Sequence, residues 1–182
     1  MSKKEPWGEG TPWANSTAFF TYLRGCLRKA WSHHPVKLNL IKKQRKQVPN
    51  VNPKGNKPTV WGFDCVLCDK TFPIKEGNVD HITPAGSLKK TEDIQGFVER
   101  LLYVTEDDLR LICKTCNSTL AYADKQGVSF QEASLQKLAI DLTKKGMDKA
   151  WLESKGIVPC GNATKRREQI LTKLREEMDN AT

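Results

Sequence analysis

Hydrophobic residues recur at every third or fourth position in several parts of the chain, which is the spacing of an amphipathic helix. The clearest stripe consists of Phe19, Phe20, Leu23, Cys26, Leu27, Ala30 and Trp31. Asn15 or Ser16 is suited to cap the helix that carries this stripe, because a short polar side chain accepts hydrogen bonds from free backbone N–H groups. Further helical patterns cover residues 36–46, 91–104, 117–125, 129–146, 147–155 and a last segment from about Thr164.

Short extended segments lie between these helical patterns. They cover residues 60–63, 71–74, 79–82 and 109–112. We expect 71–74 and 79–82 to pair as a hairpin, because residues 75–78 suit a turn. Residues 48–59 contain three prolines and read as a loop or linker. The mixture of helices with a small sheet predicts an α+β fold.

These patterns divide the chain into four parts. Residues 1–15 form an irregular arm, and residues 16–59 form a basic helical extension with its linker. Residues 60–126 hold the strands together with two cysteine pairs, and residues 127–182 form a C-terminal helical region. A chain of 182 residues is long enough for one domain of ordinary size with an appended unit.

The positive charge is concentrated at the N-terminal end. The net charge is +9, yet residues 1–60 carry 12 Lys and Arg against two acidic residues, and residues 10–63 contain no acidic residue. A segment of one sign favours a polyanionic partner, and we expect double-stranded DNA. The alternative is a solvated basic face with no partner. The candidate phosphate-binding residues are Arg24, Arg28, Lys42, Lys43, Arg45 and Lys46.

Hydropathy and cysteine use indicate the compartment. The mean hydropathy is −0.58, and no apolar run approaches the length of a membrane span. The N-terminus lacks the apolar stretch of a signal peptide, so we expect a reducing cytoplasm, without membrane association. The sequence leaves open whether the protein is a monomer or a dimer.

Four of the six cysteines form two Cys-x-x-Cys pairs, and this spacing predicts a structural zinc site. The pairs are Cys65 with Cys68 and Cys113 with Cys116, and 44 residues lie between them. The alternative is four buried thiols without a metal. Cys26 and Cys160 remain, and Cys26 is expected as a small core residue because it falls on the first helical stripe.

Asp80 and His81 lie between the pairs, and Asn117 follows the last cysteine. A neutral His81 can accept a proton from water near pH 7. The oxygens of Asp80 and Asn117 suit a hard ion such as Mg²⁺, whereas the thiols select zinc. Because adjacent strand residues point to opposite faces, we expect the strand to end or bulge at His81.

The order of these motifs resembles the HNH endonucleases, specifically the zinc-bearing ββα-metal type. The likeness covers about residues 60–125: a Cys-x-x-Cys pair, then Asp-His-Ile-x-Pro from Asp80, then Asp-Leu-Arg-Leu-Ile-Cys-x-x-Cys-Asn from Asp108. The basic N-terminal helices and the Asn after the last cysteine are similar to phage-type members. The resemblance implies a small two-stranded hairpin and helix around a zinc site, with helices added at both ends.

The resemblance also implies roles for individual residues. His81 would be the general base, Asp80 and Asn117 would bind the catalytic Mg²⁺ or Mn²⁺, and Asp108 would steady the loop beside the base. The implied reaction is hydrolysis of DNA to 5′-phosphate and 3′-hydroxyl ends, by a nicking or homing enzyme acting in the bacterial host cell. Many relatives carry a basic residue where this chain has Leu120, so Lys114 and Lys125 are considered as the transition-state cation.

Two other functions remain open at this point. One is a zinc-stabilised DNA-binding protein without catalysis, which has no need for Asp80, His81 or Asn117. The other is a dimeric resolvase of branched DNA, for which the predicted helix over residues 129–145 offers a modest dimer surface.

Overall fold

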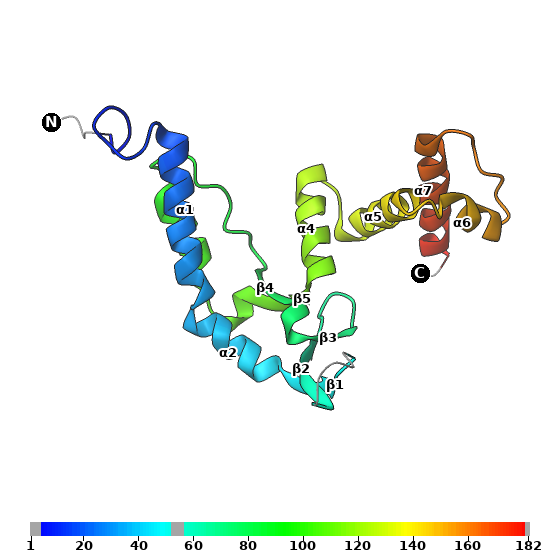
Figure 1. The fold of residues 1–182 in the computed structure, drawn as a ribbon, viewed down its shortest axis with the longest axis horizontal. Helices are drawn as coiled ribbons and strands as arrows, with labels where there is room; N and C mark the ends of the chain where they lie inside the picture. Colours follow the sequence, from blue (N-terminus) through cyan, green and yellow to red (C-terminus); the bar gives the residue numbers. More distant parts are fainter. Residues whose placement is uncertain (1–4, 52–56, 181–182) are drawn as a thin grey trace. The chain divides into compact units, whose positions relative to one another are not determined.

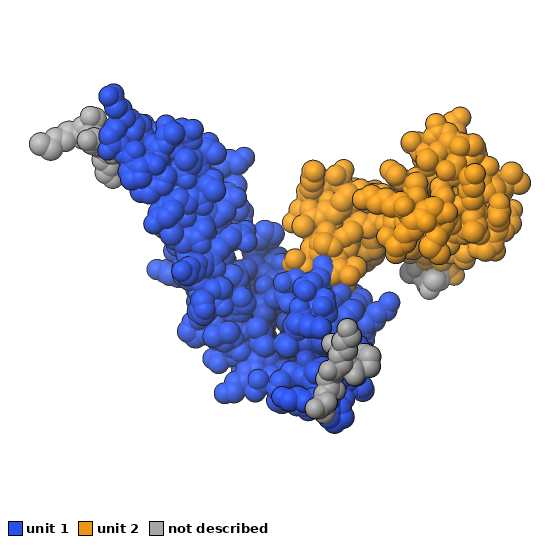
Figure 2. All heavy atoms as spheres, in the orientation of Figure 1, with its two compact units in different colours: residues 1–114 blue, residues 115–182 orange. Residues whose placement is uncertain are grey.

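The computed structural model describes residues 5–51 and 57–180. Residues 1–4 of the predicted arm, 52–56 of the predicted linker and 181–182 of the C-terminal region lie outside the described residues. The chain forms two compact units, residues 1–114 and residues 115–182 (Figure 2). Helices and small antiparallel sheets occur together, which confirms the α+β class (Figure 1).

Three helices build the core of the first unit: α1 (Ser16–Ser32), α2 (Pro35–Gln44) and α3 (Asp93–Leu102). The Asn15 side chain accepts a hydrogen bond from the N–H of Ala18 at 3.0 Å and so caps α1, as predicted. The helices bury their apolar faces against one another and against a strand. The buried cluster consists of Phe20, Trp31, Leu40, Leu88, Phe97, Leu101 and Leu109.

Aromatic side chains join the N-terminal arm to α1. The Trp7 ring lies 5.6 Å from the ring of Phe20, and the Trp13 ring lies edge-on at 5.1 Å from the ring of Phe19. On the same helix Cys26 is exposed, so the expectation that it is a core residue was wrong. The larger side chains of the stripe face the core, whereas Cys26 faces the solvent.

The first sheet contains three antiparallel strands in the order β1 (Lys46–Pro49), β2 (Thr59–Asp64) and β3 (Thr71–Pro73). The predicted loop over 48–59 therefore begins inside a strand. A Cβ atom on Gly62 would lie 2.5 Å from Cγ2 of Val48 and 2.7 Å from the carbonyl oxygen of Phe72. Only glycine fits at this position, because the neighbouring strands approach its backbone so closely.

The second sheet pairs β4 (Gly77–His81) with β5 (Leu109–Cys113). The predicted hairpin of 71–74 with 79–82 was wrong, because β3 pairs with β2, and a 3₁₀ turn η1 (Ile74–Glu76) separates β3 from β4. A second 3₁₀ turn, η2 (Glu106–Asp108), leads into β5. The register places Asp80 opposite Arg110 and His81 opposite Leu109.

The second unit is helical. Its elements are α4 (Lys114–Gln126), which continues directly from β5, α5 (Phe130–Lys144), α6 (Asp148–Ser154) and α7 (Ala163–Asp179). Ala139, Leu142, Leu152 and Ile170 form its buried core. Among the helices that the structure describes, none combines the length and the apolar content that a membrane crossing requires.

Candidate functional site

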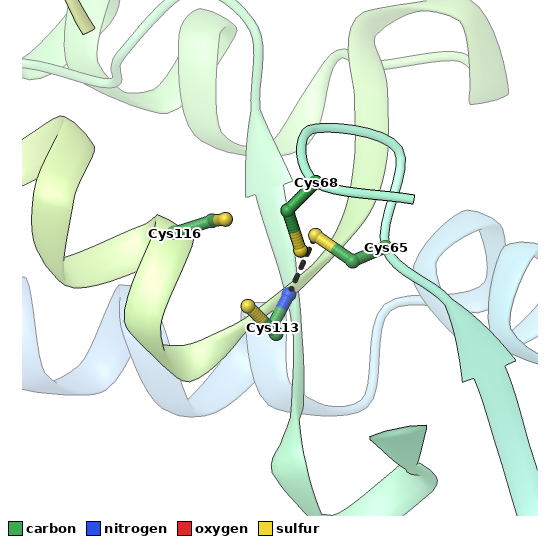
Figure 3. Close-up of side chains that lie close together, drawn as sticks. All are labelled: Cys65, Cys68, Cys113 and Cys116. Carbon is green, nitrogen blue, oxygen red and sulfur yellow. Dashed lines mark hydrogen bonds between the residues drawn. The ribbon is translucent and has the colours of Figure 1, made fainter. Parts of the chain in front are cut away.

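The four cysteines of the two pairs converge, as Figure 3 shows, and their sulfur atoms all lie within 4.8 Å of one another. Cys65 directly follows β2, Cys113 ends β5, and Cys116 lies in the first turn of α4. A tetrahedral zinc ion with bonds of about 2.3 Å holds its sulfurs about 3.8 Å apart. The cluster therefore fits zinc with small side-chain movements, and the predicted metal-binding cysteines are brought together.

The Cys65–Cys68 turn is prepared for metal binding by backbone hydrogen bonds. The N–H of Cys113 donates to Sγ of Cys65 at 3.3 Å. Burial raises the pKa of the Cys65 thiol, but the N–H groups of Cys113, Leu67 and Cys68 and the thiol of Cys68 outweigh it and lower the pKa to about 7. Because zinc binds the thiolate, these hydrogen bonds favour the form that the metal needs.

His81 is the last residue of β4, so the strand ends where the sequence analysis expected. Its Nε2 lies 3.1 Å from the carbonyl oxygen of Leu101, and its ring centroid lies 4.3 Å from that of Trp31. A carbonyl oxygen only accepts hydrogen bonds, so Nε2 carries the hydrogen and Nδ1 is left as the basic nitrogen. Trp31 and Leu101 thus hold the ring in one orientation.

A pocket of about 380 Å³ opens beside His81. Its lining consists of His81, Thr83, Glu99, Arg100, Tyr103, Val104 and Asp108. Tyr103 is 79% exposed at the end of α3, which is unusual for a large aromatic side chain. The pocket therefore joins a histidine, two carboxylates and a guanidinium on an open surface.

Asp108 holds the loop next to His81. Its carboxylate accepts hydrogen bonds from the N–H and the hydroxyl of Thr105 at 2.7 and 2.9 Å, and its carbonyl oxygen accepts one from the N–H of Ile82 at 2.9 Å. The hydrogen bonds from the Thr105 backbone and hydroxyl lower the pKa of Asp108, and nearby His81 lowers it further. The ionised carboxylate of Asp108 can hold this loop because Thr105 supplies the hydrogen-bond donors.

Asp80 turns away from the pocket that His81 lines. Its Oδ2 accepts hydrogen bonds from Nε and Nη2 of Arg110 at 2.9 and 2.8 Å, and both side chains are 23% exposed. The two adjacent residues therefore contact different neighbours, as alternation along a strand requires. Asp80 is not among the described residues that line the 380 Å³ pocket.

Asn117, the other predicted ligand of the catalytic metal, lies half-buried in the first turn of α4. Leu120 follows one turn later in the same helix. Within the described ranges, the four cysteines are the one group of three or more His, Cys, Asp or Glu side chains that could share an ion. Binding of Mg²⁺ or Mn²⁺ by Asp80 and Asn117 stays a prediction.

The six basic residues expected to contact DNA have varied surroundings. Lys43 pairs with Glu106 at 2.7 Å, and Lys46 pairs with Asp64 at 2.6 Å. The guanidinium carbon of Arg45 lies 4.3 Å from the ring centroid of Trp61. Arg24 donates a hydrogen bond to the carbonyl oxygen of Leu88 at 3.2 Å. Arg28 and Lys42 are exposed. DNA contact by this set stays a prediction.

Sequence reasoning missed three side chains around His81. Trp31 belongs to the apolar stripe of the first helix, which marked it as core but not as a neighbour of the histidine. Arg100 and Arg110 lie in segments whose spatial neighbours depend on the packing of α3 and on the register of β4 with β5. Knowing that register would have identified Arg110, since it faces Asp80 across the sheet.

No family model, no curated protein and no solved structure matches this chain. Its metal centre is therefore characterised by its own residues: four converging cysteines that suit a zinc ion in an α+β protein.

Proposed function

We propose that this protein is a zinc-stabilised DNA endonuclease of the HNH class. The observation that carries the proposal is the environment of His81. Its Nε2 is held by the Leu101 carbonyl oxygen at 3.1 Å, its ring packs on Trp31, and it lines an open pocket. A histidine oriented in this way is arranged to accept a proton through Nδ1.

The order of elements supports the same class. Strand β5, which pairs antiparallel with β4, is followed directly by α4, and the cysteine cluster includes the end of β5 and the first turn of α4. Two strands and a helix around zinc are what the ββα-metal type requires. The zinc would stabilise this arrangement, since a structural zinc site contributes directly to folding.

In the proposed reaction His81 takes a proton from the water that attacks the phosphorus atom. Asp80 and Asn117 would hold a Mg²⁺ or Mn²⁺ ion, which when bound supplies Lewis-acid stabilisation of the phosphate charge. In-line displacement places the attacking and leaving oxygens on opposite sides of the phosphorus. The bond from phosphorus to the 3′ oxygen breaks as the water oxygen bonds to phosphorus, and the leaving 3′ oxygen takes a proton from solvent.

The ion pair of Asp80 with Arg110 bears on how the metal is held. Arg110 occupies Oδ2 of Asp80, whereas Oδ1 receives no hydrogen bond among the described residues. The carboxylate can therefore ligate through Oδ1 while Arg110 stays in place. Arg110 would then orient the ligand, as a hydrogen-bonding partner of a metal-binding carboxylate commonly does.

The test is nicking of supercoiled plasmid DNA in the presence of Mg²⁺ or Mn²⁺, with a chelator as the blank. We expect His81→Ala to lower the nicking rate by roughly 10²- to 10⁴-fold, which is the usual contribution of a general base. His33→Ala is the matched control, because His33 lies exposed after α1 and its imidazole hydrogen-bonds, among the described residues, with Ser32 and the Lys29 carbonyl oxygen alone. Nicking by His81→Ala at the wild-type rate would overturn the mechanism.

A zinc-stabilised DNA-binding protein without catalysis is the second candidate. The ion pair of Asp80 with Arg110 favours it, because a carboxylate already paired has no need of a metal ion. Such a protein would shift the plasmid band without nicking the DNA, whichever divalent ion is added.

If nicking is observed, a four-way junction compared with a linear duplex of the same arm sequence separates a resolvase from a nicking or homing enzyme.

A further inference from the structure

The guanidinium of Arg100 lies in the same pocket as His81 and is held in place from two sides. Its Nε donates to the carbonyl oxygen of Ala85 at 3.1 Å. This bond joins α3 to the segment that follows β4. It fixes the plane of the guanidinium, because Nε is part of the rigid planar group.

Two glycines lie beside this guanidinium. A Cβ atom on Gly96, within α3, would lie 3.0 Å from Nη1, and one on Gly86 would lie 3.4 Å from Nη2. Gly96 is costly in the middle of a helix, where glycine is about 1 kcal/mol less favourable than alanine. Gly86 has φ +81°, a conformation that other residues rarely adopt. Gly96 therefore lies where the guanidinium comes close, whereas Gly86 makes an ordinary contact and is required by its backbone conformation.

The two terminal nitrogens of Arg100 are available for a ligand. Neither Nη1 nor Nη2 makes a hydrogen bond or an ion pair with a described residue, and the side chain is exposed. Of the two lysines considered from the sequence, Lys114 lies 3.4 Å from Glu76 and Lys125 is exposed on α4. Arg110 pairs with Asp80 at 2.8 Å.

The charges of the pocket show why a cation is needed there. Besides His81, the lining contains the carboxylates of Glu99 and Asp108. Glu99 accepts a hydrogen bond from Gln95 at 2.8 Å, and Asp108 accepts two from Thr105. These donors are neutral, so Arg100 is the one positively charged side chain in the described lining. A phosphate group could enter only with its help, since like charges repel at this distance.

We propose that Arg100 binds the phosphate group of the DNA strand that is cut, through Nη1 and Nη2. A guanidinium matches two phosphate oxygens with two parallel hydrogen bonds, which fixes both position and orientation. In naming the scissile phosphate, the inference rests on the proposed nuclease function. Arg100 then takes the place of the basic residue that many HNH relatives carry where this chain has Leu120.

The first experiment measures nicking at saturating DNA concentration for Arg100→Ala, Arg100→Lys and, as the control, Lys149→Ala. Lys149 is exposed on α6 and lies outside the pocket. Arg100→Ala should lower kcat on the order of 10²-fold, as loss of one charge-stabilising donor does, and Arg100→Lys should recover part of the loss. Lys149→Ala should leave kcat unchanged. Wild-type kcat in Arg100→Ala would overturn the inference.

A second variant, Gly96→Ala, separates positioning from stability. Alanine favours the helix, so the melting temperature should not fall, while the new methyl group displaces Nη1. We expect a several-fold lower kcat in a protein that is at least as stable. Unchanged kcat would mean that the position of the guanidinium is unimportant for the reaction.

A binding measurement keeps the inference testable if the wild-type protein does not nick DNA. The Nε–H resonance of Arg100, assigned from its loss in Arg100→Lys, is followed by NMR while a short duplex is added with chelator present. A shift that saturates with DNA, and is absent with Gly96→Ala, supports phosphate binding by Arg100 even if the nuclease proposal fails. A resonance that does not move in a protein that binds the duplex would overturn the inference.

Discussion

Two Asp–Arg ion pairs of the same length lie in very different surroundings. Asp80 meets Arg110 at 2.8 Å across the β4–β5 sheet, and both side chains are 23% exposed. Asp148 meets Arg166 at 2.8 Å between α6 and α7, where the exposures are 5% and 12%. Arg166 also donates to the carbonyl oxygens of Cys160 and Gly161 at 2.9 and 2.8 Å. The second pair is enclosed and its cation satisfied, whereas the first is open to water and ions.

The difference in exposure between the two ion pairs determines how much each contributes to stability. A buried pair is expensive to break, because removal of one partner leaves an uncompensated charge in a medium that cannot hydrate it. An ion pair that water can reach is broken at a smaller cost in the free energy of unfolding. Asp80 therefore remains available to a ligand, while Asp148 serves the packing of α6 against α7.

The two units also differ in net charge. The first unit carries 19 Lys and Arg against 12 Asp and Glu, and the second carries 11 against nine. Most of the excess positive charge thus belongs to residues 1–114, whereas the described ion pairs of the second unit mainly join its own helices.

The largest expected effect comes from the zinc site. Cys68→Ser should abolish zinc binding and unfold the β2–β3 region, because structural zinc in small domains contributes about 10 kcal/mol or more to folding. Zinc content and circular dichroism measure the result. Cys160→Ser is the matched control, because Cys160 lies outside the cluster. A folded, zinc-loaded Cys68→Ser protein would contradict the zinc assignment.

The two pairs are compared directly by the same substitution at each aspartate. Asp148→Asn should lower the stability of the second unit by about 3 kcal/mol, since it leaves the Arg166 charge buried and unpaired. Asp80→Asn should change stability far less and should reduce metal-dependent nicking. Urea denaturation followed by circular dichroism, together with the plasmid assay, gives both values. Equal destabilisation by the two variants would remove the distinction between the pairs.

The stability contribution of Asp148 should depend on pH. The hydrogen bond from Arg166 holds the pKa of Asp148 below its ordinary value of 3.8, against the opposing effect of burial. A lowered pKa in the folded state stabilises the protein above the unfolded pKa and loses this contribution as pH falls through the folded value. The stability difference between wild type and Asp148→Asn should therefore be full at pH 7 and shrink below about pH 4. A difference that stays constant to pH 3 would contradict this origin.

The smallest effect is expected where an ion pair joins α5 to α7 at the surface. Arg175 pairs with Glu132 at 2.5 Å, and this interaction lowers the pKa of the Glu132 carboxyl. Because Arg175 is 49% exposed, Arg175→Met should lower the melting temperature only slightly, and this small loss should disappear at high salt. Thermal melts at low and high salt measure it, and a loss as large as that of Asp148→Asn would show that exposure does not rank these pairs.

Local features of this protein could be read from its residues. The helix cap at Asn15, one of the two candidates that the sequence offers, and the convergence of the four cysteines were predicted, because each depends on neighbouring positions or on ligand chemistry. The end of β4 at His81 was also expected. The strand pairing was predicted wrongly, because residues 75–78 suit a turn and suggested a hairpin of 71–74 with 79–82 that does not form.

Long-range packing decided the rest. Spacing in the chain identified the cysteines, because metal ligation requires particular residue types. It could not show that Trp31 would lie on His81 or that Arg110 would face Asp80. These neighbours are separated by long stretches of chain, and they meet only because α1, α3 and β5 bury their apolar faces in one core.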